Sequence, residues 1–329
     1  MRGDEVVLER ALVEADPART PRDAAPDARA LAIRDRILLR HRHRNPVRGH
    51  SRAVSWTSGL VVATAAVVFA VAMVLPQGAA VASTPTPLAF HGTGTVSEIV
   101  QDADTALAAA AGPSVPERSV VTATWSYSAD DDGAHALIVP QLSTTTWNED
   151  LSGHVRIVNG VPYDPADAVA NNRGEIVSSG DVVDEFDMEP GEFNTPVPLV
   201  PGESATDVRA MLQAFGMPDE PTAFDVVKAI TFVFGHWTLT NAQHAELLAL
   251  IETAGGADAL GETRDRLGRP VAGLRVLSAD GYVSDVVLIS METGRIVGVE
   301  RTALKDDGIS PVGAITGYRV WDIDEEQTR

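Results

Sequence analysis

Three histidines near the amino terminus are spaced closely enough to bring their imidazole rings to one metal ion. His41, His43 and His50 stand within a run of arginines, with no acidic or thiol side chain beside them. Neutral imidazole is a common metal ligand, but the positive charge of the neighbouring guanidinium groups opposes the binding of a cation. The favoured interpretation is a solvated surface, and a metal site is the alternative.

Two acidic groups could attract cations. Asp130, Asp131 and Asp132 are consecutive, so they lack the alternating ligand spacing and the distal Glu of an EF-hand loop, and with Gly133 they predict a turn. A longer acidic stretch is expected to be a solvated strand edge and loop, with attraction of cations or of a basic partner as the alternative. Its members are Asp181, Asp184, Glu185, Asp187, Glu189 and Glu192.

Aromatic and sulfur-containing side chains gather in the second half of the chain. His236 and Trp237 could line a pocket, but packing of Trp237 with His236 at the surface is favoured. Four further residues are interpreted as core: Met188, Met211, Met217 and Phe215.

Sequence motifs of the familiar enzyme classes are missing from this chain. It contains no G-x-S-x-G, no P-loop, no H-E-x-x-H and no dinucleotide fingerprint, and its serines have no recognisable His and Asp partners. We therefore expect a non-enzymatic protein, and we assign no catalytic, cofactor-binding or metal-ligating residue. A cell-envelope hydrolase with an unrecognised site is the less favoured alternative.

A hydrophobic run predicts where the chain meets a membrane. Residues 56–75 carry no charge, and as a helix rising about 1.5 Å per residue they would span roughly 30 Å of hydrocarbon. The predicted transmembrane helix covers residues 53–76. A cleaved signal peptide is the alternative, because Ala80-Val81-Ala82 resembles a cleavage site, but the segment before the run is too long for a signal peptide.

Charge is distributed unevenly on the two sides of this run. Residues 1–52 hold 12 Arg against 8 Asp and Glu, a net charge of +4; the whole chain has −20, which leaves −24 for the rest. Arginines beside a span mark the cytoplasmic side, so we expect the N-terminus inside and the acidic bulk outside the cell membrane. This position favours orientation and contact with anionic lipid over nucleic-acid binding. The arginines are Arg34, Arg36, Arg40, Arg42, Arg44, Arg48 and Arg52.

The chain is expected to have four parts. Residues 1–52 form an Arg-rich cytoplasmic segment, 53–76 the span, 77–90 a Pro-rich linker, and 91–325 an extracytoplasmic domain. With no cysteine there is no disulfide and no thiolate metal site, so this domain must be held together by its hydrophobic core. About 240 residues beyond the span are enough to build one.

Helices and strands of the outer domain are marked by local signals. A helix is expected over 95–111, and three more begin at Ser204, Thr222 and Thr240, each with a capping partner three residues on and a later glycine stop. Strands are expected before and after these three helices, and 187–203 as a loop. The expected strands are 121–127, 136–139, 143–147, 155–158, 175–178, 263–267, 271–277, 283–289, 295–301 and 314–321. This order predicts an α+β fold with an antiparallel sheet and helices on one face.

Parts of the sequence resemble an actinobacterial family of uncharacterised single-pass membrane proteins. The similar segments are VPLVPGESATDVRAMLQAFG (197–216), HAELLALIETAGGADALGETRDRLGRPVAGLRV (244–276) and VVLISMETGRIVGVE (286–300). Within them lie the turn 265–269 and the hairpin 292–295; the Arg-rich start, the single span and PTPLAF (85–90) are also similar.

The resemblance implies a fold and a set of possible partners. Genes of this family are often found near those of extracytoplasmic-function sigma factors, and the outer domain is similar to the lipoprotein-carrier fold, a curved antiparallel sheet with helices across its concave side. We expect a lipid, an acyl chain or a partner protein to bind in the concavity of the outer domain's sheet, and a cytoplasmic sigma factor to bind residues 1–52. The zinc type of anti-sigma domain is excluded, because the chain has no Cys. A tethered carrier of lipid or lipoprotein without signalling is the alternative.

Overall fold

The computed structural model describes residues 84–126, 138–164, 176, 178–305 and 310–323. The chain divides into two units, Met1–Thr57 and Ser58–Arg329, and all described residues belong to the second. The predicted cytoplasmic segment, the predicted span and the first part of the linker therefore lie outside the described residues. None of the helices among the described residues has the length and hydrophobicity that a membrane span requires.

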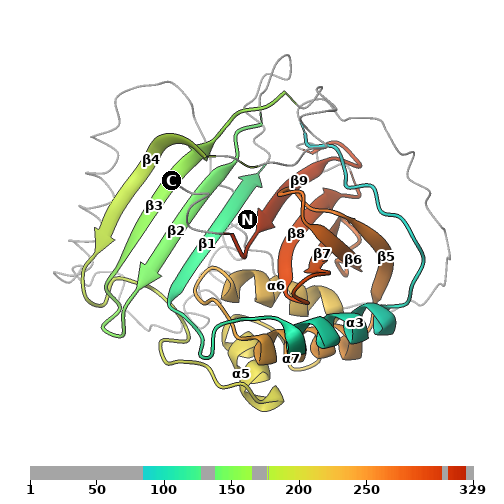
Figure 1. Cartoon of the computed structure of the whole chain (residues 1–329), viewed down its shortest axis with the longest axis horizontal. Coiled ribbons are helices and arrows are strands. Elements are labelled where there is room, and N and C mark those ends of the chain that lie inside the picture. Colours follow the sequence, from blue (N-terminus) through green and yellow to red (C-terminus); the bar gives the residue numbers. More distant parts are fainter. Residues whose placement is uncertain (1–83, 127–137, 165–175, 177, 306–309, 324–329) are drawn as a thin grey trace, which may run out of the picture. The chain divides into compact units, whose positions relative to one another are not determined.

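A nine-stranded antiparallel sheet organises the described residues. Its strand order is β4-β3-β2-β1-β9-β8-β7-β6-β5, so two meanders meet where β1 pairs with β9 (Figure 1). The strands are β1 Ser119–Ser126, β2 Gln141–Trp147, β3 Gly153–Gly160, β4 Ser178–Met188, β5 Ala257–Arg264, β6 Pro270–Leu277, β7 Val283–Ser290, β8 Ile296–Ala303 and β9 Ile315–Val320.

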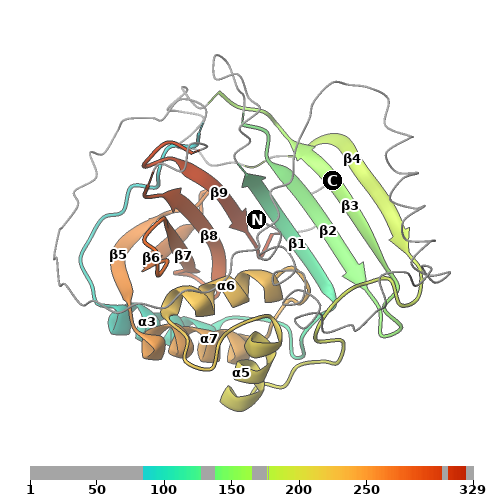
Figure 2. The same cartoon turned by 180° about the vertical axis from the view of Figure 1, so that it is seen from behind.

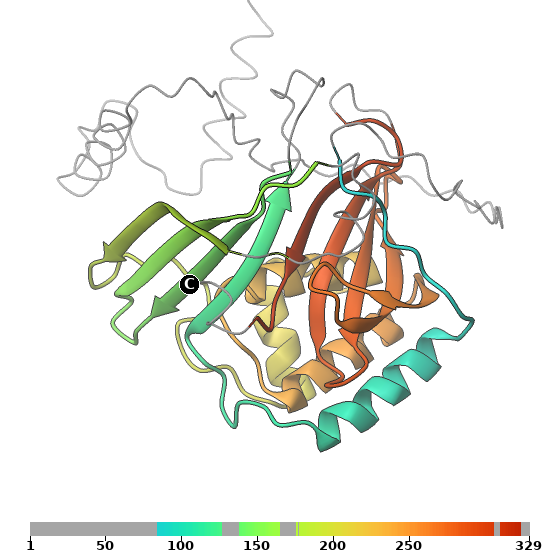
Figure 3. The same cartoon turned by 45° about the horizontal axis from the view of Figure 1, so that its top comes forward.

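Four α-helices are described, and all lie on the same side of the sheet (Figures 1 and 3). They are α3 Val96–Ala109, α5 Ala205–Ala214, α6 Ala223–Val233 and α7 Asn241–Ala254. The predicted α+β class is confirmed.

The starts of these helices follow from local capping. Thr222 and Thr240 form capping boxes with Asp225 and Gln243, and the hydroxyl of Ser204 accepts a hydrogen bond from the third residue of α5. Each cap satisfies amide groups that the first turn of a helix leaves unpaired. This is why the three predicted starts are confirmed.

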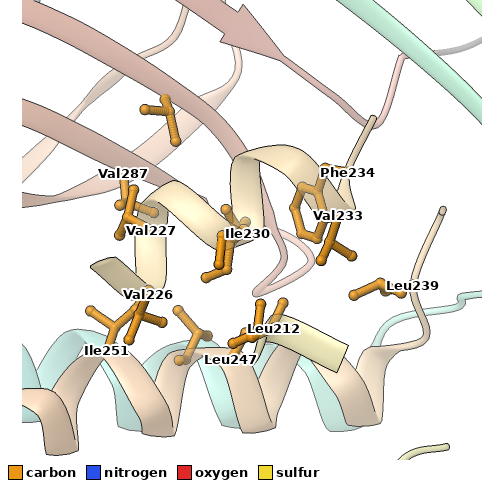
Figure 4. Packing of buried hydrophobic residues seen from close by; sticks show 14 of the residues in the cluster. Leu212, Val226, Val227, Ile230, Val233, Phe234, Leu239, Leu247, Ile251 and Val287 are labelled. Atoms are coloured by element: carbon orange, nitrogen blue, oxygen red, sulfur yellow. The ribbon is translucent and has the colours of Figure 1, made fainter. Parts of the chain in front are cut away.

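Helix α6 lies at the centre of the main hydrophobic core. Val226, Val227, Ile230 and Val233 are at most 1% exposed. Figure 4 shows Val227 beside Val287 of β7, and the other side of α6 facing α7. Strands β5 to β9 bend round α6 (Figures 1 and 2). Leu274 of β6, Val287 of β7 and Val299 of β8 belong to the same buried cluster as the side chains of α6, so this side of the sheet is filled there with side chains.

The opposite face of the sheet is covered in part by the segment that leads into α3. Leu88 and Phe90 pack against a small buried cluster of Val271, Leu288 and Val297, and the amide of His91 donates to the carbonyl of Glu262 in β5. Residues 84–90, which we predicted to be linker, thus lie against β5 to β8.

Two edge strands differ from the sequence-based expectation. Strand β4 covers Ser178–Met188, although the strand was predicted at 175–178, the acidic stretch from 181 as a strand edge and loop, and 187–203 as a loop; β5 ends at Arg264, whereas the predicted strand was 263–267. Both lie at sheet edges, where exposed side chains do not alternate in hydrophobicity as those of a half-buried strand do.

We predict that Thr222→Ala lowers the free energy of unfolding by about 1 kcal/mol, because it removes the side-chain cap of α6. Denaturant unfolding measures the change. Thr222→Ser retains a hydroxyl and should stay close to the wild type; an equal loss in both variants would contradict the role of the cap.

Candidate functional site

The two halves of the sheet are covered unequally. The principal contacts between helices and sheet are those of α6 with β6 and β7 and of α3 with β5. In β2 and β3 only Leu142, Trp147, Val158 and Gly160 are buried, and no side chain of β4 is buried. Strands β2 to β4, which we call the open half-sheet, therefore have accessible side chains on both faces.

Side chains on the helix-side face of the open half-sheet are mostly polar. Val120 of β1 faces the helices, so Thr122 and Thr124, two and four residues further on, lie on the same face. Residues paired in register share a face, which extends this surface across β2 and β3. It continues through Gln141, Ser143, Thr145, Val155, Ile157 and Asn159.

The predicted acidic stretch lies mainly along the outermost strand of this half-sheet. Asp181 and Asp184 of β4 are exposed, and so are Val182 and Val183, at 47% and 48%. The stretch is confirmed as a strand edge followed by a turn, where the backbone amide of Glu189 donates to the Glu192 carboxylate.

On the face of β4 that points away from the helices, Glu185 and Asp187 pair with side chains of β3. The imidazole of His154 lies 2.8 Å from Asp187 and 3.4 Å from Glu185, and Arg156 lies 3.9 Å from Glu185. These exposed pairs add little stability, since solvent screens them.

A cavity lies at the seam between the two meanders. β1 pairs with β9 only from Ala123 to Ser126, and beyond this point the cavity, of about 200 Å³, separates the start of β1 from residues 321–323. Three large aromatic side chains form part of its wall: Phe234, Trp237 and Trp321. It therefore combines an apolar wall with polar groups that are described next.

His244 of α7 is the most perturbed group at this cavity. It is 5% exposed, and its Nδ1 accepts a hydrogen bond of 3.2 Å from the amide of Ile296. Burial, together with the nearby charge of Arg295, lowers the pKa of His244 to about 3. The ring is thus neutral near pH 7 and carries its proton on Nε2.

One rim of the cavity is held by a charged network. The guanidinium of Arg295 donates to the Asn241 side chain at 2.8 Å and to the Asp322 carboxylate at 3.2 Å. The Asn241 amide in turn donates to the carbonyls of Leu107 and Ala110 at the end of α3. Asp322 has a left-handed backbone, with φ 57°, where β9 has ended. This network joins α3, α7, β8 and the end of β9.

A second buried polar group lies beneath the turn 265–269. The Arg266 guanidinium donates to the Glu300 carboxylate at 2.5 Å and to the carbonyl of Thr86 at 2.7 Å. Burial raises the pKa of Glu300, and Arg266 counteracts this. The Tyr318 ring lies 5.7 Å from the Arg266 guanidinium, and burial raises the pKa of its hydroxyl. An adjoining cavity of about 530 Å³ has the charged side chains of Glu262, Arg264 and Asp265 in its lining, together with apolar ones that include Leu88 and Met291.

The predicted His236-Trp237 pair is placed in part as expected. Trp237 is 1% exposed and packs edge-on against Trp147, so its packing role is confirmed. His236 is half-buried and lies between the rings of Phe193 and Phe215, at 5.5 and 4.9 Å, where we had expected a surface position. It lies outside the cavity lining.

The remaining candidates separate into core residues and residues outside the described part. Met211 and Met217 are buried in the main core, and Met188 and Phe215 pack against it, as predicted. His41, His43 and His50 and the Asp130–Asp132 run lie outside the described residues. In the part of the chain that is described, no three His, Asp or Glu side chains are placed to hold a metal ion.

Sequence reasoning did not find His244, Arg295 or Trp321. The nearest signal was the polar His244 on a helix with an apolar face. Its partners are the backbone of Ile296 and the charge of Arg295, both far along the chain, so no local spacing pointed to them.

Comparison with protein-family models, with curated proteins and with solved structures found no match for this chain. The resemblance set out above therefore stays a prediction.

We predict that His244 makes the fold sensitive to acid. Its pKa is about 3 in the folded protein and 6.5 for an unburied histidine, as in the unfolded chain. Below pH 6.5 the unfolded chain therefore binds a proton that the native state excludes. Stability should fall as the pH falls through this window, by up to about 1.4 kcal/mol per pH unit. Unfolding curves between pH 7 and 4 measure it. In His244→Gln the side chain can still accept a hydrogen bond from the Ile296 amide, but the free energy of unfolding should depend less steeply on pH. An unchanged dependence on pH would refute the assignment to His244.

Proposed function

We propose that this chain is a non-enzymatic, single-pass membrane protein whose outer α+β domain binds a partner protein on the open half-sheet. Residues 53–76 anchor it in the cell membrane, residues 1–52 lie in the cytoplasm, and the domain 91–325 is extracytoplasmic. The observation that carries the binding part of the proposal is that β4 has no buried side chain.

Strand β4 favours an extended, basic partner segment. An edge strand presents unpaired amide and carbonyl groups, to which another chain can add as a further strand. Asp181 and Asp184 place negative charge beside exposed Val182 and Val183. Lys or Arg side chains that alternate with apolar ones would match this surface, and the attraction would speed association at low salt.

The lipid-carrier alternative has weaker support. A carrier needs a deep apolar cavity beneath its helices, and there α6 fills the bend of the sheet. The seam cavity, at about 200 Å³, is smaller than the roughly 300–1,000 Å³ typical of ligand pockets. The cavity of about 530 Å³ is large enough, but the charged side chains of Glu262, Arg264 and Asp265 form part of its lining, which an acyl chain would not match.

The buried ionisable groups favour a binding role over catalysis. Arg266 pairs with Glu300, Arg301 with Asp285 and Arg269 with Asp265, so these charges stabilise each other inside the fold. A general base needs a pKa near the working pH, and the pKa of His244 is far below it.

Residues 1–52 are the part of the chain that we propose to bind a cytoplasmic partner. Their arginines beside the span support a cytoplasmic position, and the family resemblance names a sigma factor as the partner. Any signal from the outer domain would have to pass through the single span.

Site-specific photocrosslinking tests the outer site. In the full chain in its native membrane, a benzophenone side chain at Val183 should form one discrete protein adduct. Asp181→Lys with Asp184→Lys should reduce its yield several-fold, because these changes reverse the charge beside the strand edge. Leu277, with a similar exposure of 46%, is the matched control and should give none. Equal adducts at both positions, or no effect of charge reversal, would refute the docking site.

Co-purification tests the inward partner. The full chain in detergent should retain the sigma factor encoded beside it, and a chain that starts at residue 53 should not. Retention by neither, or equally by both, would remove the sigma factor from the proposal without affecting the outer site.

A further inference from the structure

The seam cavity has the dimensions of a site for a small aromatic molecule. Its volume is about 200 Å³, and a protein cavity of roughly 150 Å³ lined by apolar side chains is known to bind benzene. One ring with one small substituent therefore fits. Phe234 and Trp321, which line it, stand edge to face with centroids 4.9 Å apart, a rigid aromatic wall against which a flat ring can pack.

Two residues of the cavity lining, His244 and Trp321, each have one uncharged donor without a hydrogen-bond partner among the described residues. Nδ1 of His244 is occupied by the Ile296 amide, so Nε2 carries the hydrogen, and it has no hydrogen-bond partner among the described residues. His244 lines the cavity and is 5% exposed. Nε1 of Trp321 is buried, and a buried donor without a partner costs free energy, which an acceptor atom of a ligand would recover.

The charges at the cavity decide which acceptor fits. Arg295 is engaged by Asn241 and Asp322, and the exposed Glu117 adds a negative charge at the lining. An anionic acceptor would meet two carboxylates and only one guanidinium, which is already paired. A cation would place a donor against the Nε2 hydrogen. An uncharged carbonyl oxygen meets neither difficulty.

We propose that the seam cavity binds a small aromatic molecule that carries an uncharged carbonyl group, with the carbonyl oxygen accepting from Nε2 of His244 and the ring against Phe234 and Trp321. This site is separate from the open half-sheet, and it stands or falls independently of the partner-protein proposal.

Three probes of equal shape test it: benzamide, benzoate and benzamidinium. Saturation-transfer NMR and calorimetry on the full chain in detergent should show saturable binding of benzamide. We expect it to be about tenfold tighter than benzamidinium, which corresponds to one net hydrogen bond. Equal affinities for the three probes, or no saturable binding of benzamide, would overturn the proposal.

Two variants place the binding in this cavity. Ser119→Phe adds a ring to the lining and should abolish benzamide binding; the contact that Ser119 makes is through its backbone carbonyl, which accepts from the Thr238 hydroxyl and is retained. Glu117→Gln alters only an exposed carboxylate. It should leave benzamide affinity within about twofold and raise that of benzoate, since it removes a repulsion. Benzamide binding that persists in a folded Ser119→Phe chain would refute the site, and a Glu117→Gln chain that binds benzoate no better would refute the charge argument.

Discussion

The burial of helix α6 is the constraint on which the rest of the structure depends. Its side chains are apolar around most of its circumference, and four of them, Val226, Val227, Ile230 and Val233, are almost fully removed from water. Burial of each of these side chains contributes roughly 1.5–3 kcal/mol. Because they lie on different sides of the helix, one neighbouring surface cannot bury all of them. The sheet bends round one side of α6, and α7 and α5 close the other. The bend, the helical layer and the main core all follow from the need to cover this helix.

Covering α6 with the second meander has a consequence for the first. The helices contact chiefly β5 to β7, and the strands beyond β1 extend past them. The outer strands then have mostly polar or charged side chains, which oppose aggregation of exposed strands, with Val182 and Val183 as exposed apolar exceptions. The same arrangement leaves a short β1–β9 pairing and a cavity beside it. Both proposed binding sites thus result from the same cause, namely that only one half of the sheet covers α6.

Buried charge in this domain is organised by pairing. Arg266 and Glu300 are 2% and 3% exposed and meet at 2.5 Å, and the carboxylate of Asp285 meets Arg301. Such pairs contribute little net stability, but loss of one partner leaves a costly unpaired charge, so they hold the turn 265–269 and the strands in one arrangement. His244 is the exception, because it is buried without a carboxylate and remains neutral.

The sequence by itself determined the elements whose signals are local. The caps at Ser204, Thr222 and Thr240 act within one turn, and half-buried strands such as β1 alternate in hydrophobicity, so the α+β class could be predicted. The bounds of strands β4 and β5 were predicted wrongly, because edge strands lack that alternation. Only the tertiary structure decided that β1 joins β9, that α6 is covered by one half of the sheet, and that His244, Arg295 and Trp321 meet at one cavity. These contacts join residues far apart in the chain, and they depend on which surfaces bury α6 rather than on any spacing along the sequence.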